Sequence, residues 1–220
     1  SLGESFEALA RIYEAEHPKT SVLINTAGSQ VLALQLEQGL RADSFASAHQ
    51  THIKRLVDGG ILGESVHFAD SRLVVVVPKG NDKTRDARQV LSEAQQIVVG
   101  HPSAPIGQYT EKLFQVIKQQ YGKQYLRSLN ERIVSREKNV RLVRAKVVMG
   151  ASDAAIVYET DAIGHSQVDM VHLPDALSID TEFYLAQHRD ASPQGKAWFR
   201  FLRSAAAKKT LESFGFRVRY

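Results

Sequence analysis

Residues 21–48 read SVLINTAGSQVLALQLEQGLRADSFASA. The apolar run at 22–24 predicts a short strand, and the small polar residues 25–29 predict a turn after it. Helical spacing of Leu32 and Leu36 follows, and Gly39 marks the end of the expected helix. The first amides of a helix lack partners within the helix, and the helix dipole favours negative charge there. The stretch therefore predicts half of an anion site, with the Ser29 hydroxyl as an additional donor.

Strand-like and helical patterns alternate along the rest of the chain. Helices are expected at 4–17, 49–58, 108–121, 139–149 and, as a pair, within 193–214. Strands are expected at 44–48, 72–77, 97–100, 133–134, 154–158, 168–173 and 183–186. The polar residues 81–89 are interpreted as a surface connection. This alternation predicts an α/β fold built of βαβ units.

The amino-acid composition excludes several classes of protein and of binding site. A hydrophobic content of 43% and a charged content of 24% over 220 residues are typical of a soluble globular protein. No apolar run approaches the roughly 20 residues that cross a bilayer. Cysteine is absent, which excludes disulfides and Cys-based zinc sites. The net charge of +4 suits an anionic ligand, whereas the scattered Lys and Arg residues do not indicate nucleic acid as a partner.

Three loops share the pattern of a small or Pro-rich turn that precedes a helix. They contain Gly28 and Ser29, residues 105–107, and Asn139 with Val140. In open α/β sheets ligands bind beyond the carboxyl ends of the strands. Most such turns bind nothing, so from the residues alone a binding and a structural interpretation of the three loops stay equally open. Tyr158 likewise fits either a core aromatic residue or a hydroxyl donor to a ligand.

Other candidate sites carry weaker signals. His49 and His52 have the i,i+3 spacing of half a metal site, with His67 further on, but a solvated helix is the preferred interpretation and no metal site is expected. A block of basic residues is interpreted as a solvated face rather than an anion channel: Arg132, Arg136, Lys138, Arg141, Arg144 and Lys146. A Ser/His hydrolase is disfavoured because no G-x-S-x-G motif occurs.

Several motifs in order give a resemblance to a known family. These are Ser1-Leu2, Ala27-Gly28-Ser29, QLEQG at 35–39, ADSFASA at 42–48, LVVVVPK at 73–79, Asn139-Val140-Arg141, AIVYETDA at 155–162 and Phe214-Gly215-Phe216. Over essentially the whole chain they resemble periplasmic molybdate-binding proteins of ABC importers, within the type II periplasmic binding protein fold.

The resemblance implies a two-lobed α/β protein that has mixed sheets flanked by helices and binds its ligand in the cleft between the lobes. Lobe 1 is expected at 1–77 and 185–220, and lobe 2 at 78–184. The expected function is capture of molybdate or tungstate for a membrane permease, by a monomer that is periplasmic, or secreted and membrane-anchored. No enzymatic activity and no cofactor are expected.

The resemblance also implies which residues hold the oxyanion. Ser1 and Ser29 belong to lobe 1, and lobe 2 contributes the backbone amides of Ile106 and Val140 with the Tyr158 hydroxyl. Neutral donors and helix N-termini bind such a dianion without a buried counter-ion. Another oxyanion, such as sulfate or phosphate, and the effector domain of a transcription regulator remain as alternatives.

Three features depart from the family pattern. The family pattern has a strand before Ala-Ala-Ser, whereas this sequence begins at Ser1. The loop at 101–107 is one residue shorter than usual and has Ile106 where alanine is common. His49 occupies a position at which an acidic residue is common. The loop at 101–107 bears most directly on the expected site.

Overall fold

The computed structural model describes residues 2–80 and 86–220. Ser1 and part of the connection expected at 81–89 lie outside the described residues. Contacts divide the chain into two compact units. Unit 1 comprises the residues up to Ser71 together with Glu182–Tyr220, and unit 2 comprises Arg72–Thr181. The chain passes from one unit to the other at 71/72 and at 181/182, a few residues earlier than the expected 77/78 and 184/185.

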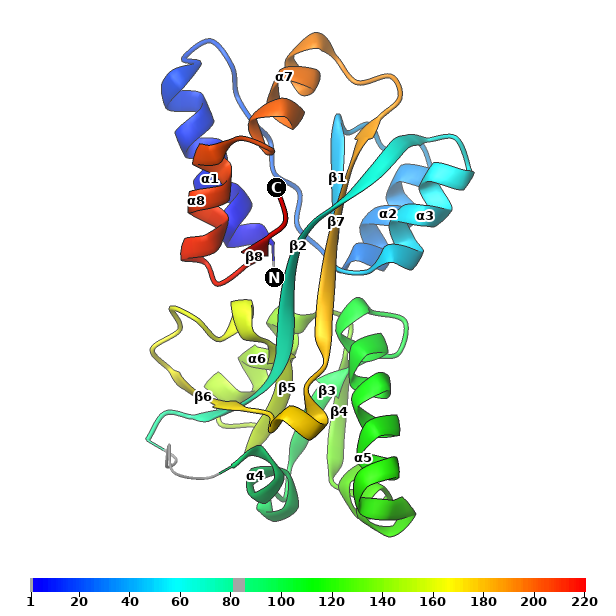
Figure 1. Cartoon of the computed structure of the whole chain (residues 1–220), viewed down its shortest axis with the longest axis vertical. Coiled ribbons are helices and arrows are strands. Elements are labelled where there is room, and N and C mark those ends of the chain that lie inside the picture. Colours follow the sequence, from blue (N-terminus) through cyan, green and yellow to red (C-terminus); the bar gives the residue numbers. More distant parts are fainter. Residues whose placement is uncertain (1, 81–85) are drawn as a thin grey trace. The chain divides into compact units, whose positions relative to one another are not determined.

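Unit 1 has a mixed set of helices around a small sheet. Its helices are α1 (Gly3–Glu16), α2 (Ser29–Glu37), α3 (Gln50–Asp58), α7 (Pro193–Phe201) and α8 (Ala205–Ser213). Its strands are β1 (Ser44–Ser47), the first part of β2 (Leu62–Pro78), most of β7 (Asp180–His188) and β8 (Arg217–Val218). Helices α1 and α8, from opposite ends of the chain, pack side by side (Figure 1).

The expected strand at 22–24 is wrong. Residues 19–26 form neither helix nor strand, and the side chain of Leu23 is 93% exposed. A strand needs a neighbouring strand for its backbone hydrogen bonds, and here the Val22 amide instead donates to the carboxylate of Glu14, at 2.7 Å. The turn before α2 is therefore preceded by an irregular segment. An apolar run of three residues is too short to distinguish a strand from such a segment.

Unit 2 contains the parallel part of the fold. Strands β3 (Ile97–Gly100), β4 (Ile133–Glu137) and β5 (Ala154–Tyr158) are parallel, because β3 pairs with both of the others in parallel register. The second part of β2 pairs antiparallel with β5 and with β6 (Val168–His172). Every residue of β5 is buried, which accounts for its unbroken apolar sequence.

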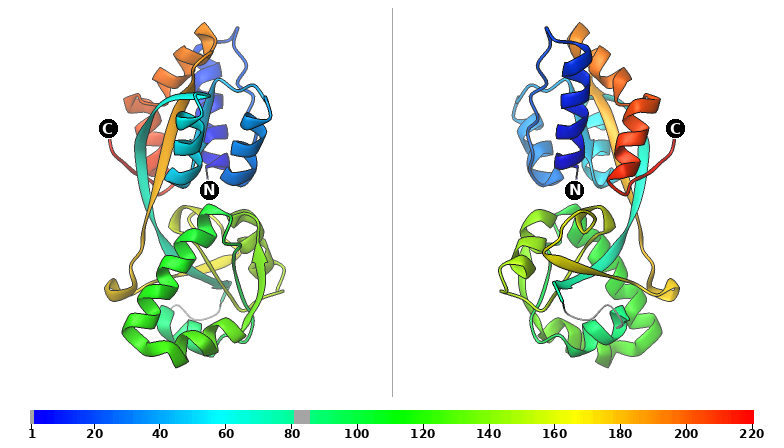
Figure 2. Two further views of the ribbon diagram at one scale, coloured as in Figure 1. Left: turned by 90° about the vertical axis from the view of Figure 1, so that its right-hand side faces the viewer. Right: turned by 90° about the vertical axis from the view of Figure 1, so that its left-hand side faces the viewer.

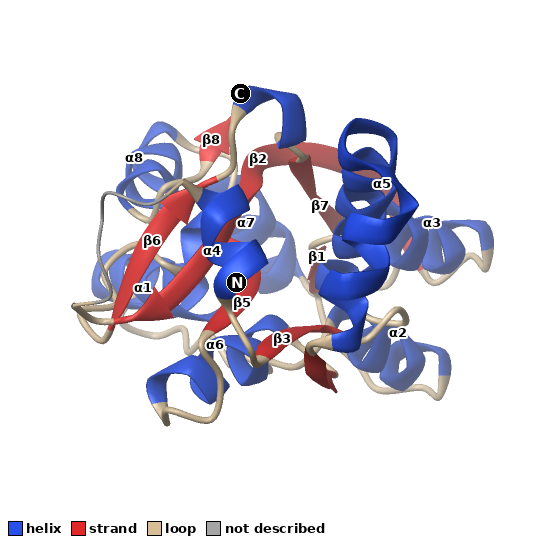
Figure 3. Cartoon of the chain, turned by 90° about the horizontal axis from the view of Figure 1, so that it is seen from below, coloured by secondary structure: helices blue, strands red, loops and turns tan. Residues whose placement is uncertain are grey.

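Helices surround these strands in unit 2. They are α4 (Ala87–Glu93), α5 (Pro105–Glu131) and α6 (Val140–Val148), with the short 3-10 helices η1 (Glu159–Asp161) and η2 (Asp175–Leu177). Helices α5 and α6 pack against β3, β4 and β5 (Figure 3). Helix α5 is longer than expected because it continues across a kink at Gly122, whose φ of 86° other residues rarely adopt. Helix α5 is seen in green in both views of Figure 2.

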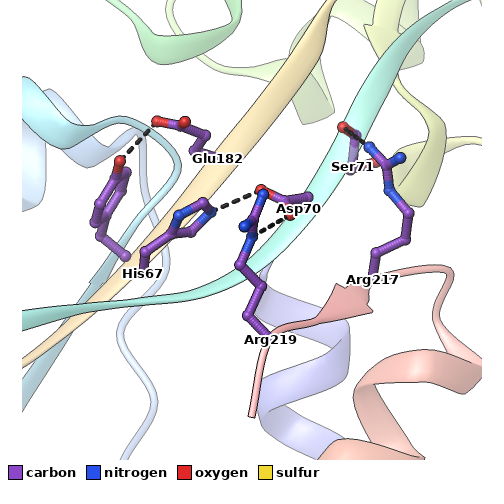
Figure 4. Close-up of polar contacts among 7 residues, drawn as sticks. His67, Asp70, Ser71, Glu182, Arg217 and Arg219 are labelled. Carbon is purple, nitrogen blue, oxygen red and sulfur yellow. Dashed lines mark hydrogen bonds and ion pairs between the residues drawn. The ribbon is translucent and has the colours of Figure 1, made fainter.

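A polar network binds the C-terminal segment to β2 within unit 1 (Figure 4). Asp70 is only 7% exposed, and its carboxylate contacts the His67 ring and the Arg219 guanidinium. Arg217 donates to the backbone oxygen of Ser71 at 2.9 Å. A buried carboxylate is costly unless it is paired, so these contacts fix β8 beside β2.

No helix within the described ranges has both the length and the apolar character needed to cross a membrane.

Candidate functional site

The carboxyl ends of the three parallel strands of unit 2 lie at one edge of its sheet. Strand β3 leads to the first turn of α5, β4 leads to the first turn of α6, and β5 ends at Tyr158. This edge is where ligands bind in open α/β sheets. Ile106 and Val140 follow β3 and β4, and Tyr158 ends β5, so the three residues that the family resemblance implies for unit 2 belong to this edge.

The first turn of α5 is built to present a backbone amide. Its N-cap is Ala104, which has no polar side chain, and its first residue is Pro105, which has no amide hydrogen. The Ile106 amide is therefore the first donor of the helix, and helical geometry gives it no partner within the helix. Ile106 as a whole is 1% exposed and its side chain is apolar, so its backbone amide is the one group of this residue that can donate a hydrogen bond to an oxyanion.

Two glycines allow β3 and α5 to come this close. A Cβ atom on Gly107 would lie 1.9 Å from the backbone oxygen of His101, and one on Gly100 would lie 2.5 Å from the amide nitrogen of Gly107. The same Cβ on Gly100 would lie 2.5 Å from Cγ2 of Ile106. The shortened loop thus accommodates isoleucine by packing its side chain over Gly100 and inside unit 2.

Helix α6 presents its N-terminus in a similar way. Asn139 is the N-cap, and its side-chain oxygen accepts a hydrogen bond from the Leu142 amide at 3.0 Å. Val140 is the first residue of the helix and is 5% exposed. The cap fixes the direction of the helix start while the Val140 amide has no partner within the helix.

Tyr158 supplies a hydroxyl rather than an amide. Its side chain is 1% exposed, and its ring packs edge-to-face on the ring of Tyr109, with centroids 6.1 Å apart. Burial raises the pKa of Tyr158 well above its usual value, and the nearby Tyr109 hydroxyl and Asp161 carboxylate raise it further. The phenol consequently stays protonated at neutral pH and is able to donate a hydrogen bond.

Unit 1 carries a second group of donors where β1 ends. Helix α2 begins at Ser29 after the N-cap Gly28, and α3 begins at Gln50. The Ser29 Oγ accepts a hydrogen bond from the Ala48 amide at 3.2 Å, and both groups are buried. Because Oγ accepts there, its own hydrogen is available to donate elsewhere. Ser1, the other residue expected to bind the anion from this part of the chain, lies outside the described residues.

The turn after β1 is held by its own polar contacts. The Ser47 Oγ donates to the backbone oxygen of His49 at 2.7 Å and accepts from its amide at 3.2 Å. His49 is the N-cap of α3, and its Nδ1 accepts from the Thr51 amide at 3.2 Å. In this contact Nδ1 is the acceptor, so the His49 ring takes the capping role that a carboxylate oxygen of an acidic residue would take.

The structure corrects one of the weaker expectations. His52 is only 6% exposed, so the solvated-helix interpretation is wrong for it, although no group of three or more His, Cys, Asp or Glu residues in the described ranges could hold a metal ion. The basic block lies at the surface, since each of its six residues is exposed or half-buried, and some of its members make surface contacts. Arg132 donates to the backbone oxygens of Ser92 and Ala94, and Arg136 pairs with Glu111 at 3.1 Å.

Two groups that contact the expected site residues were not predicted from the sequence. The Ala48 amide orients Ser29 across 19 positions of sequence, a distance that no local pattern encodes. Tyr109 follows Ile106 by three residues and so comes from the same helix start, but an aromatic residue at that spacing is indistinguishable from an ordinary core residue.

Comparison with known proteins places this arrangement in a family. The family model described as bacterial extracellular solute-binding protein matches residues 1–217. A Bacillus subtilis protein, YvgL, named as an ABC transporter substrate-binding lipoprotein, is 31% identical, over 98% of this chain and 83% of the relative. The molybdate-binding protein ModA of Mycobacterium tuberculosis is 29% identical over 98% of this chain and 81% of its own length.

Solved structures agree on the fold. The periplasmic molybdate-binding protein of Azotobacter vinelandii has a TM-score of 0.83 at 17% identity, covering 100% of this chain and 96% of that one. The sulfate-binding protein SubI of Mycobacterium tuberculosis has a TM-score of 0.84 at 21% identity, covering 97% and 82%. At these identities the likeness shows the type II periplasmic binding protein fold and not the ligand. By its sequence match and its fold, this chain belongs to the bacterial extracellular solute-binding proteins, which bind solutes for transport and are not enzymes.

Proposed function

We propose that this protein captures molybdate and delivers it to the membrane permease of an ABC importer. The observation that carries the proposal is the edge of unit 2 at which the amides of Ile106 and Val140 and the hydroxyl of Tyr158 follow three parallel strands. All three are neutral donors. Relatives named as molybdate-binding proteins, aligned over 98% of the chain or more, support the same ligand.

The two units are proposed to act on one ion. Ser29, with Ser1, would donate from unit 1, and Ile106, Val140 and Tyr158 would donate from unit 2. Molybdate is an acceptor-only dianion at neutral pH, so a set of donors matches it without a buried cation. Tungstate has the same charge and shape, and we propose that it binds as well.

The chemistry of the donors also sets what should be rejected. An oxyanion that carries a proton must donate one hydrogen bond, and against a donor it would leave a buried polar group unsatisfied. Phosphate is therefore disfavoured at neutral pH. Sulfate carries no such proton but is smaller, so its hydrogen bonds would be long in a site sized for molybdate.

Isothermal titration of dialysed protein with molybdate, tungstate, sulfate and phosphate tests the proposal. We expect binding of one molybdate or tungstate per monomer and much weaker binding of the other two. Tyr158→Phe and Ser29→Ala should each weaken molybdate binding by roughly 10- to 100-fold, the value of a hydrogen bond to a charged group. Tight binding of sulfate without binding of molybdate would show that sulfate is the ligand. Absence of binding with all four anions would refute oxyanion capture.

The cellular role follows from the same proposal. A protein that collects an anion for an importer works outside the cytoplasmic membrane, so we propose that it is periplasmic, or secreted and membrane-anchored, and acts as a monomer. Reconstituted permease whose ATP hydrolysis rises with loaded protein, and not with the Tyr158→Phe variant at the same molybdate concentration, would support delivery.

A further inference from the structure

Tyr158 differs from the other proposed donors of unit 2 in how its direction is fixed. A helix start holds the Ile106 and Val140 amides, whereas a phenol can swing about its side-chain torsions. The backbone of Tyr158 is well held, because it pairs with Leu73 of β2 and the next residue, Glu159, receives two hydrogen bonds from Arg72, at 2.9 and 3.0 Å. These contacts set where the ring begins, and the direction of its hydroxyl depends on the side chains that pack against the ring.

The ring of Tyr109 is in direct contact with the ring of Tyr158. It is 2% exposed, lies on the second turn of α5 and meets the Tyr158 ring at an interplanar angle of 80°. Edge-to-face contact at 6.1 Å between centroids is a favoured arrangement for two aromatic rings. Tyr109 is itself restrained by its own helix, since the Lys112 ammonium lies 4.7 Å from its ring centroid.

We propose that Tyr109 is a positioning residue that aims the Tyr158 hydroxyl at the bound oxyanion through the contact between their rings. One helix, α5, then performs two tasks: it supplies the Ile106 amide and fixes the direction of a donor that belongs to β5. The inference rests on the proposed function, because it assigns Tyr109 a role in the same site. The raised pKa of Tyr158 is consistent with it, since the group being aimed is a permanent donor.

A double-mutant cycle on molybdate affinity separates this role from general packing. Tyr109→Phe keeps the ring and should bind within about twofold of wild type. Tyr109→Leu removes the ring and should bind about tenfold more weakly, the factor that ~1.4 kcal/mol of ring contact gives. In a Tyr158→Phe background, which has already lost the hydroxyl, Tyr109→Leu should cause no further loss.

A matched control lies on the same helix. Tyr121 is half-buried, and its ring contacts Arg88 and Tyr125 at the far end of the helix from Ile106. Tyr121→Leu should leave molybdate affinity unchanged. Circular dichroism and thermal melting check that each variant folds, and Tyr109→Met, which retains more volume, replaces Tyr109→Leu if the latter does not.

Two results would overturn the proposal. The first is equal loss from Tyr109→Leu in the wild-type and Tyr158→Phe backgrounds, which would show that Tyr109 does not act through the hydroxyl. The second is a loss from Tyr109→Phe as large as that from Tyr109→Leu, which would assign the effect to the Tyr109 hydroxyl and not to the ring.

A measurement without ligand keeps this inference separate from the proposed function. Crystal structures of ligand-free wild type, Tyr109→Phe and Tyr109→Leu give the place of the Tyr158 hydroxyl directly. We expect this hydroxyl at the same place in wild type and Tyr109→Phe and displaced in Tyr109→Leu. If wild type binds no molybdate, the proposed function fails while these structures still decide whether Tyr109 positions Tyr158. A Tyr158 hydroxyl that has not moved in Tyr109→Leu would refute positioning.

Discussion

At the scale of single residues, the surroundings of His52 conflict with its charged form. It lies in the first turn of α3, and both ring nitrogens are buried without a hydrogen-bond partner among the described residues. Burial lowers the pKa of His52, and the positive charge of Arg55 lowers it further. His49 is its other titratable neighbour, with ring centroids 6.4 Å apart.

The lowered pKa predicts a loss of stability in acid. The unfolded chain binds a proton at His52 near pH 6.5, whereas the folded protein resists doing so, hence the free energy of unfolding falls as the pH drops below about 6.5. His52→Leu, which cannot titrate, should show a shallower fall between pH 7 and pH 5 in urea unfolding. Contributions of other groups are common to both proteins, and identical slopes would contradict the prediction.

At the scale of elements, the connection from β3 to α5 is the least tolerant part of the proposed site. Gly107→Ala would place a methyl group 1.9 Å from the His101 oxygen and 2.8 Å from the Gly100 oxygen, both of them backbone atoms. The clash of this methyl group with the backbone is relieved only if the start of α5 moves away from β3. We expect the free energy of unfolding to fall by at least about 2 kcal/mol and molybdate binding to weaken with it.

A second glycine provides the control for that substitution. A Cβ on Gly63 in β2 would lie 3.5 Å from the Gln187 oxygen, an ordinary contact. Gly63→Ala should therefore change urea unfolding by less than about 0.5 kcal/mol. Wild-type affinity and stability in Gly107→Ala would show that the close approach of β3 and α5 is not needed.

Local patterns predicted the elements whose neighbours are close in sequence or whose burial is complete. The strand at Ala154–Tyr158 was predicted with its exact bounds because all its residues are apolar and buried. The first part of β2 was missed, because Glu64, His67 and Asp70 interrupt any apolar alternation. Asp70 is tolerated there only through its pairing with Arg219, which is 149 positions away and which no local pattern contains.

In the candidate site, too, some features follow from local sequence patterns and others depend on residues that are distant in the sequence. The turns before α2, α5 and α6 follow from turn chemistry, which a sequence displays directly, although α5 begins at Pro105 and not at the expected 108. The choice of Ile106 and Val140 as donors came from the family resemblance. The groups that orient these donors cannot be found from a local sequence pattern. The Ala48 amide contacts Ser29, and the Tyr109 ring contacts Tyr158, only in the folded chain.

At the scale of the whole molecule, the proposed function links two units that each have a core of their own. If one ion takes hydrogen bonds from both units, its binding energy must stabilise both. At 100 times the dissociation constant a ligand stabilises the folded state by about 2.7 kcal/mol. An ion held by unit 2 alone would stabilise only the unit that carries Ile106, Val140 and Tyr158, and the segment at Ser29 would be unaffected.

Hydrogen exchange read by mass spectrometry distinguishes these cases. With saturating molybdate we expect slower exchange in a peptide covering the start of α2, in unit 1, and in one covering the start of α5, in unit 2. Helix α7, also in unit 1 but at the opposite end of the chain from α2, serves as the internal reference. Tyr158→Phe, although its change lies in unit 2, should reduce protection at the start of α2 at a fixed subsaturating concentration. Protection confined to unit 2 would mean that the ion does not join the two units, and the proposed role of Ser29 would then be wrong.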